Sequence, residues 1–283
     1  MSEVSNTIGI NHFGMQNVGY VAPNTLQKAG LGYLKTQGVN SASINNQYDY
    51  FTHSNVSKTA ARNPIEAAVD DCLVRVAPKI YLNKYINEGL IKKAAASNPR
   101  ISEILAQKGL EANVEIENVT GKIQEHFLST YNKAKELGAN LPLDEYSALL
   151  QASLLHDIGK AFIPKEILNK PSALTANERE IVDLHAEIGA EVLKSLNLSP
   201  KTVEAVRLHH TECSSPIKQN SEMAQILSVA DVYSALGEER PYKKPFTNEQ
   251  VRSIMQNDTR LNQDVVNNIF YSQDLSNMSN FKI

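Results

Sequence analysis

From about residue 64 onward, apolar residues recur every three to four positions, the spacing typical of helices that bury one face. The pattern is densest over residues 120–137 and over residues 143–158. Gly138 is expected to end the first of these two helices. Strand-like alternation is confined to residues 112–120, which we interpret as either a short strand or a connector. The pattern therefore predicts an all-α fold, a helical bundle with inward-facing side chains.

Local start and stop signals divide this pattern into separate helices. Asn or Ser directly before Pro marks three helix starts, and Thr followed three residues later by Glu or Gln marks two capping boxes. Pro78 is expected to break or kink the first helix, and Gly109 and Gly237 are expected to end later ones. The helices predicted by these signals begin near Pro64 and then cover residues 101–108, 164–169, 175–196, 200–210, 221–236 and 263–271, with another after the capping box at Thr247.

Residues 1–60 carry no such period and are rich in Asn, Ser, Gly, Gln and Tyr. A segment of this kind buries too little apolar area to offset its ordering entropy, so we expect a flexible leader, or an arm that orders on a partner. We divide the rest into an N-terminal helical region, residues 61–118, and a main helical domain, residues 119–283. Residues 1–110 are the expected contact region for a homodimer or a signalling partner.

Composition narrows the functional classes. The formal net charge of −3 gives no basic excess for DNA binding, and no apolar run reaches the roughly 18 residues that span a membrane. The first residues lack the pattern of a signal peptide, and the two cysteines, Cys72 and Cys213, lack the spacing of a disulfide framework or zinc ribbon. These features favour a cytoplasmic globular protein.

Five of the seven histidines fall between residues 126 and 210, each on or at the end of a predicted helix. Taken singly, His126 or His185 has an ordinary interpretation as a partly buried structural residue. His209 and His210 are adjacent, and Asp231 lies in the apolar run Ile226–Tyr233, so these groups need hydrogen bonds or a metal if buried. Together with His156 and Asp157, they supply enough nitrogen and oxygen ligands for two metal ions.

The stretch His156-Asp157-Ile158-Gly159-Lys160 is the focus of this set. Imidazole and carboxylate together suit Zn, Fe, Mn, Ni or Co better than an all-oxygen Mg site. Gly159 allows close backbone approach, and Lys160 supplies a cation beside the site for an anionic substrate.

This order of ligands resembles the HD superfamily of metal-dependent phosphohydrolases, and more narrowly its HD-GYP branch, whose best-known members hydrolyse cyclic di-GMP. The resemblance covers roughly Lys122–Met255 and implies an HD-domain helical bundle. The matching segments are His156–Lys160, Ile163–Leu168, His185–Gly189, Val229–Tyr233 and Arg240–Lys243.

Three departures bear on the substrate. The loop between His210 and Asp231 contains no Gly-Tyr-Pro, Glu212 stands one position later than the usual glutamate, and Ser234 stands where such proteins often carry aspartate. Because of these departures, it stays open whether a third metal ion binds and whether cyclic di-GMP is the substrate.

The resemblance implies two divalent transition metal ions, first Fe or Mn, with Zn, Ni or Co as alternatives. Asp157 would be shared between them, with His126, His156 and Asp231 completing one ion and His185, His209 and His210 the other. Asp157 and Lys160 would be catalytic, while Lys160, Arg240 and Lys243 would bind phosphate groups.

The function so implied is a metal-dependent phosphohydrolase, a phosphodiesterase that acts on a nucleotide or cyclic dinucleotide through a metal-activated water. Two alternatives stay open. The domain could be catalytically weak or inactive and serve as a nucleotide-binding or signalling module, or the histidines could be satisfied core residues of a structural scaffold.

Overall fold

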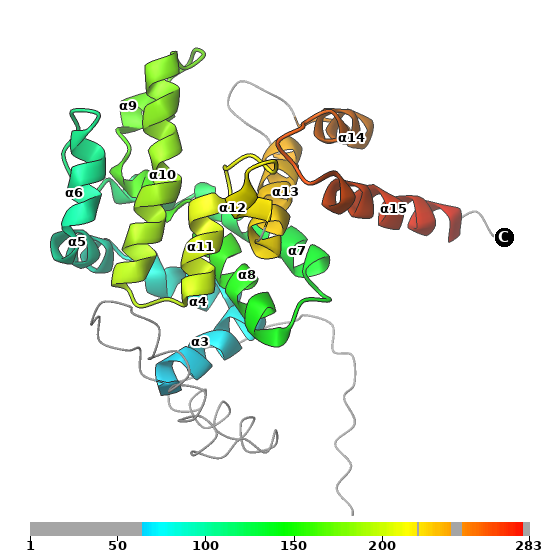
Figure 1. Ribbon diagram of the computed structural model, residues 1–283, viewed down its shortest axis with the longest axis horizontal. Coiled ribbons are helices and arrows are strands. Elements are labelled where there is room, and N and C mark those ends of the chain that lie inside the picture. Colours follow the sequence, from blue (N-terminus) through cyan, green and yellow to red (C-terminus); the bar gives the residue numbers. More distant parts are fainter. Residues whose placement is uncertain (1–63, 220, 239–244, 280–283) are drawn as a thin grey trace, which may run out of the picture. The chain divides into compact units, whose positions relative to one another are not determined.

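The computed structural model describes residues 64–219, 221–238 and 245–279, and within these ranges every regular element is a helix (Figure 1). The all-α prediction is confirmed. The expected leader, residues 1–60, lies outside the described residues. None of the described helices is long and apolar enough to cross a membrane.

Four short helices come first: α3 (Pro64–Val76), α4 (Pro78–Tyr85), α5 (Glu88–Ser97) and α6 (Pro99–Ala106). Pro78 separates α3 from α4 as predicted, because proline cannot donate the backbone hydrogen bond that would continue the helix. The side chain of Asn98 caps α6 by accepting a hydrogen bond from the amide of Arg100 at 3.1 Å. Helix α6 therefore begins two residues before the predicted start at residue 101.

The central helices are α7 (Ile123–Leu137), α8 (Leu143–Leu155), α10 (Ala176–Ser195), α11 (Pro200–Leu208) and α13 (Glu222–Gly237). Helix α7 packs against α8 and α13, and α11 packs against α8, α10 and α13. Every residue of α8 from Ser147 to Leu155 is buried, because neighbouring helices surround this part of the helix. The capping box of Thr175 with Glu178 is present at the start of α10.

Shorter elements connect these helices: η1 (Ile116–Val119), η2 (Ile158–Phe162), α9 (Lys165–Leu168) and α12 (Pro216–Gln219). The helix predicted over residues 143–158 ends at Leu155, because the chain turns there into the 3-10 helix η2, which packs against α10. Residues 112–120 form a connector with η1, without a strand. The amide of Glu115 donates to the carbonyl oxygen of Ala161 at 2.7 Å, which fastens this connector to η2.

Helices α14 (Asn248–Gln256) and α15 (Gln263–Ser279) close the fold beside the second half of α13. Thr247 and Gln250 form the predicted capping box of α14. The buried side chains that join these elements form one apolar cluster: Val229, Val251, Met255, Leu261, Val266, Ile269 and Phe270.

The N-terminal helices pack directly on the central ones. Tyr131 on α7 donates a hydrogen bond to the carbonyl oxygen of Val74 at 2.9 Å, and Asn98 donates to the carboxylate of Glu191 on α10 at 3.0 Å. These helices thus support the outer sides of α7 and α10. The domain boundary expected near residue 118 stays a prediction.

Candidate metal centre

Five elements each deliver one or two polar side chains to the same interior point. His126 comes from the first turn of α7, the pair His156-Asp157 from the end of α8, and His185 from the middle of α10. His209 and His210 follow the last turn of α11, and Asp231 projects from α13. The structure therefore brings together all seven side chains that we expected to bind metal, although their role as ligands stays a prediction.

Six of these seven side chains are buried. His156 is fully buried, Asp157 and His209 are 1% exposed, and His185 is 2% exposed. His126 and Asp231 are 6% and 8% exposed, and only His210 is classed as exposed. Burying this many polar groups is costly unless hydrogen bonds or metal ions compensate them.

The first group gathers around one oxygen of Asp157. The Nε2 atoms of His156 and His126 lie 3.4 and 3.9 Å from Oδ2 of Asp157. Asp231 joins this group, because its Oδ1 lies 3.1 Å from His126 Nε2 and 3.6 Å from His156 Nε2.

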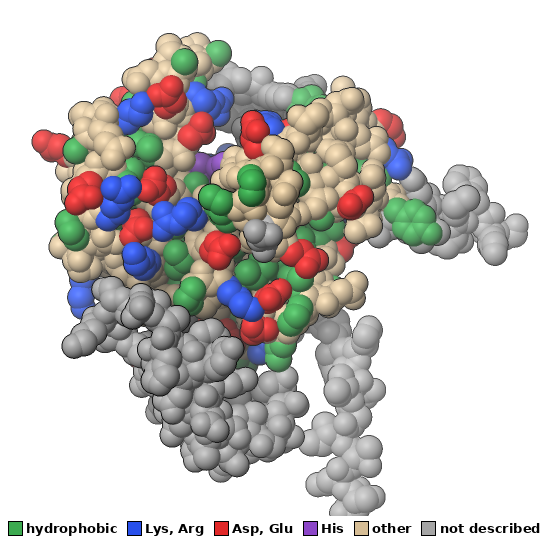
Figure 2. All heavy atoms as spheres, viewed as in Figure 1, with side chains coloured by type: hydrophobic (Ala, Val, Ile, Leu, Met, Phe, Trp, Pro, Cys, Tyr) green, Lys and Arg blue, Asp and Glu red, His purple; other side chains and the backbone are tan. Residues whose placement is uncertain are grey.

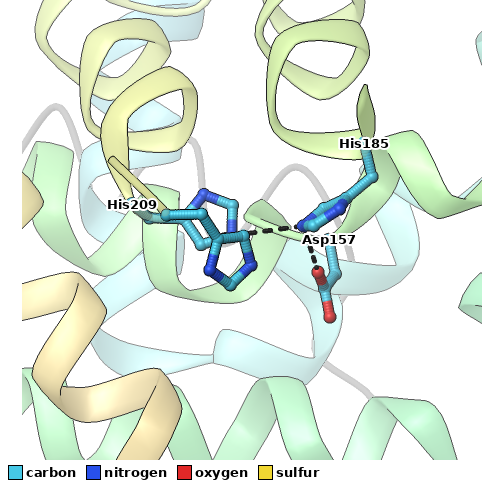
Figure 3. A group of neighbouring side chains, drawn as sticks. Asp157, His185 and His209 are labelled. Atoms are coloured by element: carbon cyan, nitrogen blue, oxygen red, sulfur yellow. Dashed lines mark hydrogen bonds and ion pairs between the residues drawn. The ribbon is translucent and has the colours of Figure 1, made fainter. Parts of the chain in front are cut away.

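The second group uses the other oxygen of the same carboxylate. His185 Nε2 lies 3.1 Å from Oδ1 of Asp157 and 3.4 Å from Nε2 of His209 (Figure 3). Asp157, His185, His209 and His210 each place one ligand atom within 4.8 Å of those of the others. Asp157 therefore stands between two groups that could each hold an ion.

Two atoms at this point lack a hydrogen bond. Nε2 of His156 and Oδ1 of Asp157 are buried, and among the described residues neither makes a hydrogen bond of normal geometry, although Nε2 of His185 lies 3.1 Å from this Oδ1. Such atoms are rare in protein interiors. An imidazole nitrogen and a carboxylate oxygen facing one space are suitable donors for a transition metal ion, which would displace the proton from the nitrogen. The residues present therefore fit such an ion.

The histidine rings are oriented by their other nitrogen. Nδ1 lies 3.0 Å from the carbonyl oxygen of Ser153 in His156, 2.5 Å from that of Val182 in His185, and 2.6 Å from that of Val206 in His209. In each case the acceptor is the carbonyl three residues earlier. Nδ1–H donates to it and Nε2 faces the centre, as is usual for metal-binding histidines.

Nearby charges also lower the pKa values of the two carboxyl groups, Asp157 and Asp231. Burial alone would raise the pKa of Asp157, but Lys160 and His156 outweigh it and hold that pKa well below the usual range. For Asp231 the opposing effect of burial is outweighed by His126 and His156, which again lower the pKa strongly. Both carboxylates are therefore ionised at neutral pH.

The histidines divide into two kinds. Burial disfavours the charged form of His156, yet Asp157 and Asp231 prevail and raise its pKa to about 10. Burial together with His185 lowers the pKa of His210 to about 4, and burial with His210 and His185 moves that of His209 well below its ordinary value. His209 and His210 are thus neutral at pH 7, the state in which imidazole binds metal.

The centre opens into a cavity of about 750 Å3, within the usual range for small-molecule sites. Figure 2 shows the hollow, with histidine at its base and both basic and acidic side chains around it. The basic residues that line it are Lys160, Arg179, Lys218 and Arg260. Nζ of Lys160 lies 2.6 Å from Oδ2 of Asp157. The predicted phosphate-binding residues Arg240 and Lys243 lie outside the described residues.

Comparison with known proteins agrees with this geometry. Residues 123–236 match the sequence model of the HD domain, and they contain all seven side chains. This segment is an HD domain. The expected resemblance to this superfamily is confirmed, although the matched residues make up less than half of the chain.

Several curated proteins are similar to the HD segment. A 3'3'-cGAMP-specific phosphodiesterase of Vibrio cholerae is 37% identical over 117 residues, which are 38% of this chain and 22% of that protein. A cyclic di-GMP phosphodiesterase of Pseudomonas aeruginosa is 40% identical over 119 residues, 39% of this chain and 28% of that protein. A cyclic di-GMP phosphodiesterase response regulator of Xanthomonas campestris is 36% identical over 123 residues, 40% of this chain and 32% of that protein. The matched part is thus at most about a third of each of these relatives.

Sequence reasoning missed three residues that support the centre. Asn118 donates hydrogen bonds to the carbonyl oxygens of Lys160 and Ile163 and so holds η2. Lys218 is a buried lysine of α12, and Glu238 contacts His126. None of the three stands in a recognisable motif, so only their position in the fold reveals them. Glu212, which stands one position later than the usual glutamate of the family, is exposed and is not among the residues that line the cavity.

Proposed function

We propose that this chain is a metal-dependent phosphodiesterase whose HD domain holds two divalent ions and hydrolyses a cyclic dinucleotide. The single observation that carries the proposal is the sharing of Asp157, which offers Oδ2 to one ligand group and Oδ1 to the other. A carboxylate placed between two sets of imidazoles is suited to a pair of ions that act together on one phosphate.

The assignment of ligands follows the two groups. His126, His156 and Asp231 would hold one ion with Asp157, and His185, His209 and His210 would hold the other. We propose Fe or Mn, with Zn, Ni or Co as alternatives, because mixed nitrogen and oxygen ligands suit these metals. When bound, the ions would supply Lewis acidity, lowering the pKa of water and neutralising negative charge on the phosphoryl oxygens.

Within this site Lys160 has two tasks. Its ammonium keeps Asp157 ionised, and it lies at the wall of the cavity where it can donate to a non-bridging phosphate oxygen. A cation at this place favours the more negative transition state over the ground state, which is the condition for catalysis.

The substrate class rests on the cavity and on the relatives. A volume of about 750 Å3 suits a nucleotide-sized ligand, and Arg179 adds a cation on the wall formed by α10. Arg240 and Lys243 stay predicted phosphate-binding residues. The curated relatives carry names that describe hydrolysis of cyclic di-GMP or 3'3'-cGAMP, which supports a cyclic dinucleotide. We further propose a cytoplasmic site of action, where such a substrate would be met.

The test is a phosphodiesterase assay on the full chain with added Mn or Fe, offering cyclic di-GMP, 3'3'-cGAMP and the generic ester bis-p-nitrophenyl phosphate. The wild type should hydrolyse at least one of the two dinucleotides, and Asp157→Ala should lose both metal and activity. Bound metal without turnover of any phosphoester would replace the proposal by a nucleotide-binding or signalling module. Absence of both metal and turnover would favour a structural scaffold.

A further inference from the structure

His126 is oriented differently from His156, His185 and His209. Those three direct Nδ1 to a backbone carbonyl three residues earlier in the chain. Nδ1 of His126 instead lies 2.9 Å from Oε1 of Glu238, a carboxylate that is 112 residues away in sequence. The ring therefore has a charged acceptor on one side and the metal centre on the other.

The packing of α7 against α13 explains this contact. The two helices run antiparallel: Lys133 of α7 lies over the ring of Tyr233, while His126, earlier in α7, meets Glu238 at the end of α13. Asp231 and Glu238 are seven residues apart, about two helical turns, so they lie on the same side of α13. His126 is held between them, with Nε2 at 3.1 Å from Asp231 and Nδ1 at Glu238.

We propose that Glu238 is a positioning residue that fixes the tautomer of His126 and strengthens Nε2 as a ligand. A carboxylate that accepts Nδ1–H leaves the lone pair on Nε2 and increases the basicity of the ring, and loss of such a partner typically weakens metal binding about 10- to 100-fold. This inference rests on the proposed metal centre. It concerns only the ion held by His126, His156 and Asp231.

Glu238 suits this role because it can be changed without disturbing the core. Its side chain is 29% exposed, it follows the last residue of α13, and it lines the cavity. Asp231, by contrast, is buried within α13 and would itself touch the ion.

The experiment measures binding of Mn2+ to the metal-free full chain by calorimetry, with the melting temperature of the metal-free protein measured in parallel. Glu238→Ala should weaken one of the two binding steps about 10- to 100-fold and leave the other step and the melting temperature unchanged. Glu238→Gln keeps an acceptor oxygen without the charge, so its loss should be smaller. Glu222→Gln, an exposed residue in the first turn of the same helix, is the matched control and should bind like the wild type.

Two results would overturn the inference. If the wild type binds two ions and Glu238→Ala binds both with unchanged affinity, Glu238 does not position a ligand, while the proposed function stands. If the wild type binds no metal, the proposed function and this inference fail together.

Discussion

Gly159 lies directly against the backbone of α10 at Gly189. A Cβ atom at Gly159 would collide with the carbonyl oxygen of His185 and lie 2.7 Å from the amide nitrogen of Gly189. The two glycines belong to the segments His156–Lys160 and His185–Gly189, which are far apart in the sequence. Their contact lets η2 approach α10 closely enough for Asp157 to meet His185.

Gly159→Ala should therefore destabilise the protein and weaken metal binding by the second ligand group, which contains His185. The methyl group has backbone atoms on its far side that cannot turn away, so overpacking should cost about 1–3 kcal/mol or more. Urea unfolding gives the free energy, and metal analysis of the same sample gives the bound ions.

Two other glycines serve as comparisons for the stability of Gly159→Ala. At Gly189 the nearest atoms to an added Cβ lie at 3.3–3.4 Å, so Gly189→Ala should cost less. At Gly237, in the last turn of α13, no atom of the described residues lies within 4 Å of an added Cβ, so alanine should be neutral or slightly stabilising. A Gly159→Ala protein as stable as Gly237→Ala would show that the close approach is unimportant.

Metal binding should release a proton from His156. The pKa of this residue is about 10 in the metal-free protein, so it carries a proton at pH 7 that a metal ion on Nε2 must displace. His209 and His210 already lack that proton, because their pKa values are lowered. Affinity for the ion at His156 should thus rise by at least about tenfold per pH unit from pH 7 toward 10.

Calorimetry at pH 7 in two buffers of different ionisation enthalpy measures this proton directly. Burial lowers the pKa of His126, but Asp231 and Glu238 outweigh it and raise that pKa, so at least about one proton should leave with the ion held by His156 and His126. None should come from His209 or His210. Binding that is independent of both pH and buffer would contradict the protonation assigned to His156.

Lys218 should make stability depend on pH above neutrality. Its buried ammonium donates to the carbonyl oxygen of Thr211 at 2.5 Å and to Oγ of Ser228 at 2.6 Å, which ties the loop after His210 to α13. Burial lowers the pKa of Lys218 to about 8, so between pH 8 and 10.5 the unfolded chain holds a proton that the folded chain has lost. Because of this group, the free energy of unfolding therefore rises with pH in that window, by at most about 1.4 kcal/mol per pH unit.

Comparing the wild type with Lys218→Met isolates this effect, because methionine has similar length but no charge. Urea unfolding of the metal-free proteins at pH 7, 8, 9 and 10 should show the wild type gaining stability relative to the variant above pH 8. A constant difference across these pH values would mean that Lys218 has an ordinary pKa.

Arg179 should distinguish a substrate with two phosphates from one with a single phosphate. It lines the cavity about 9 Å along α10 from His185, and among the described residues its side chain forms no ion pair or hydrogen bond. Arg179→Ala should raise KM for the cyclic dinucleotide about tenfold, since one charged hydrogen bond is worth roughly 1.5–3 kcal/mol before solvent screening. The KM for bis-p-nitrophenyl phosphate, which has one phosphate, should stay the same.

The matched control is Lys194→Ala, which removes a cation from the same helix away from the cavity. This variant should leave the KM of both substrates unchanged. An equal loss by Arg179→Ala on both substrates would place Arg179 at the reacting phosphate instead of a second one.

The helices and the candidate site were largely predictable from sequence because they depend on short-range rules. Capping boxes, prolines after Asn or Ser, and apolar spacing gave most helix starts within a few residues, and the order of the histidines indicated the superfamily. Contacts between distant segments were not predictable. Asn118, Glu238 and Lys218 are ordinary polar residues in the sequence. Only the packing of η1 on η2, of α7 on α13 and of α12 on α13 gives them their partners.

The change from α-helix to η2 at residue 156 was missed for a related reason. Residues 143–158 favour a continuous helix locally, whereas the packing of Gly159 on α10 requires the chain to turn after Leu155. Tertiary contact prevailed over local preference at the point where the candidate centre is built.

The most direct measurement is a titration of the chelator-treated full chain with Mn2+, with bound metal and hydrolysis of cyclic di-GMP and 3'3'-cGAMP followed in the same samples. Turnover should be negligible with the first ion and should develop as the second binds, and Asp157→Ala should show neither. Hydrolysis by the metal-free protein, or full activity in Asp157→Ala, would contradict the proposed pair of ions sharing Asp157.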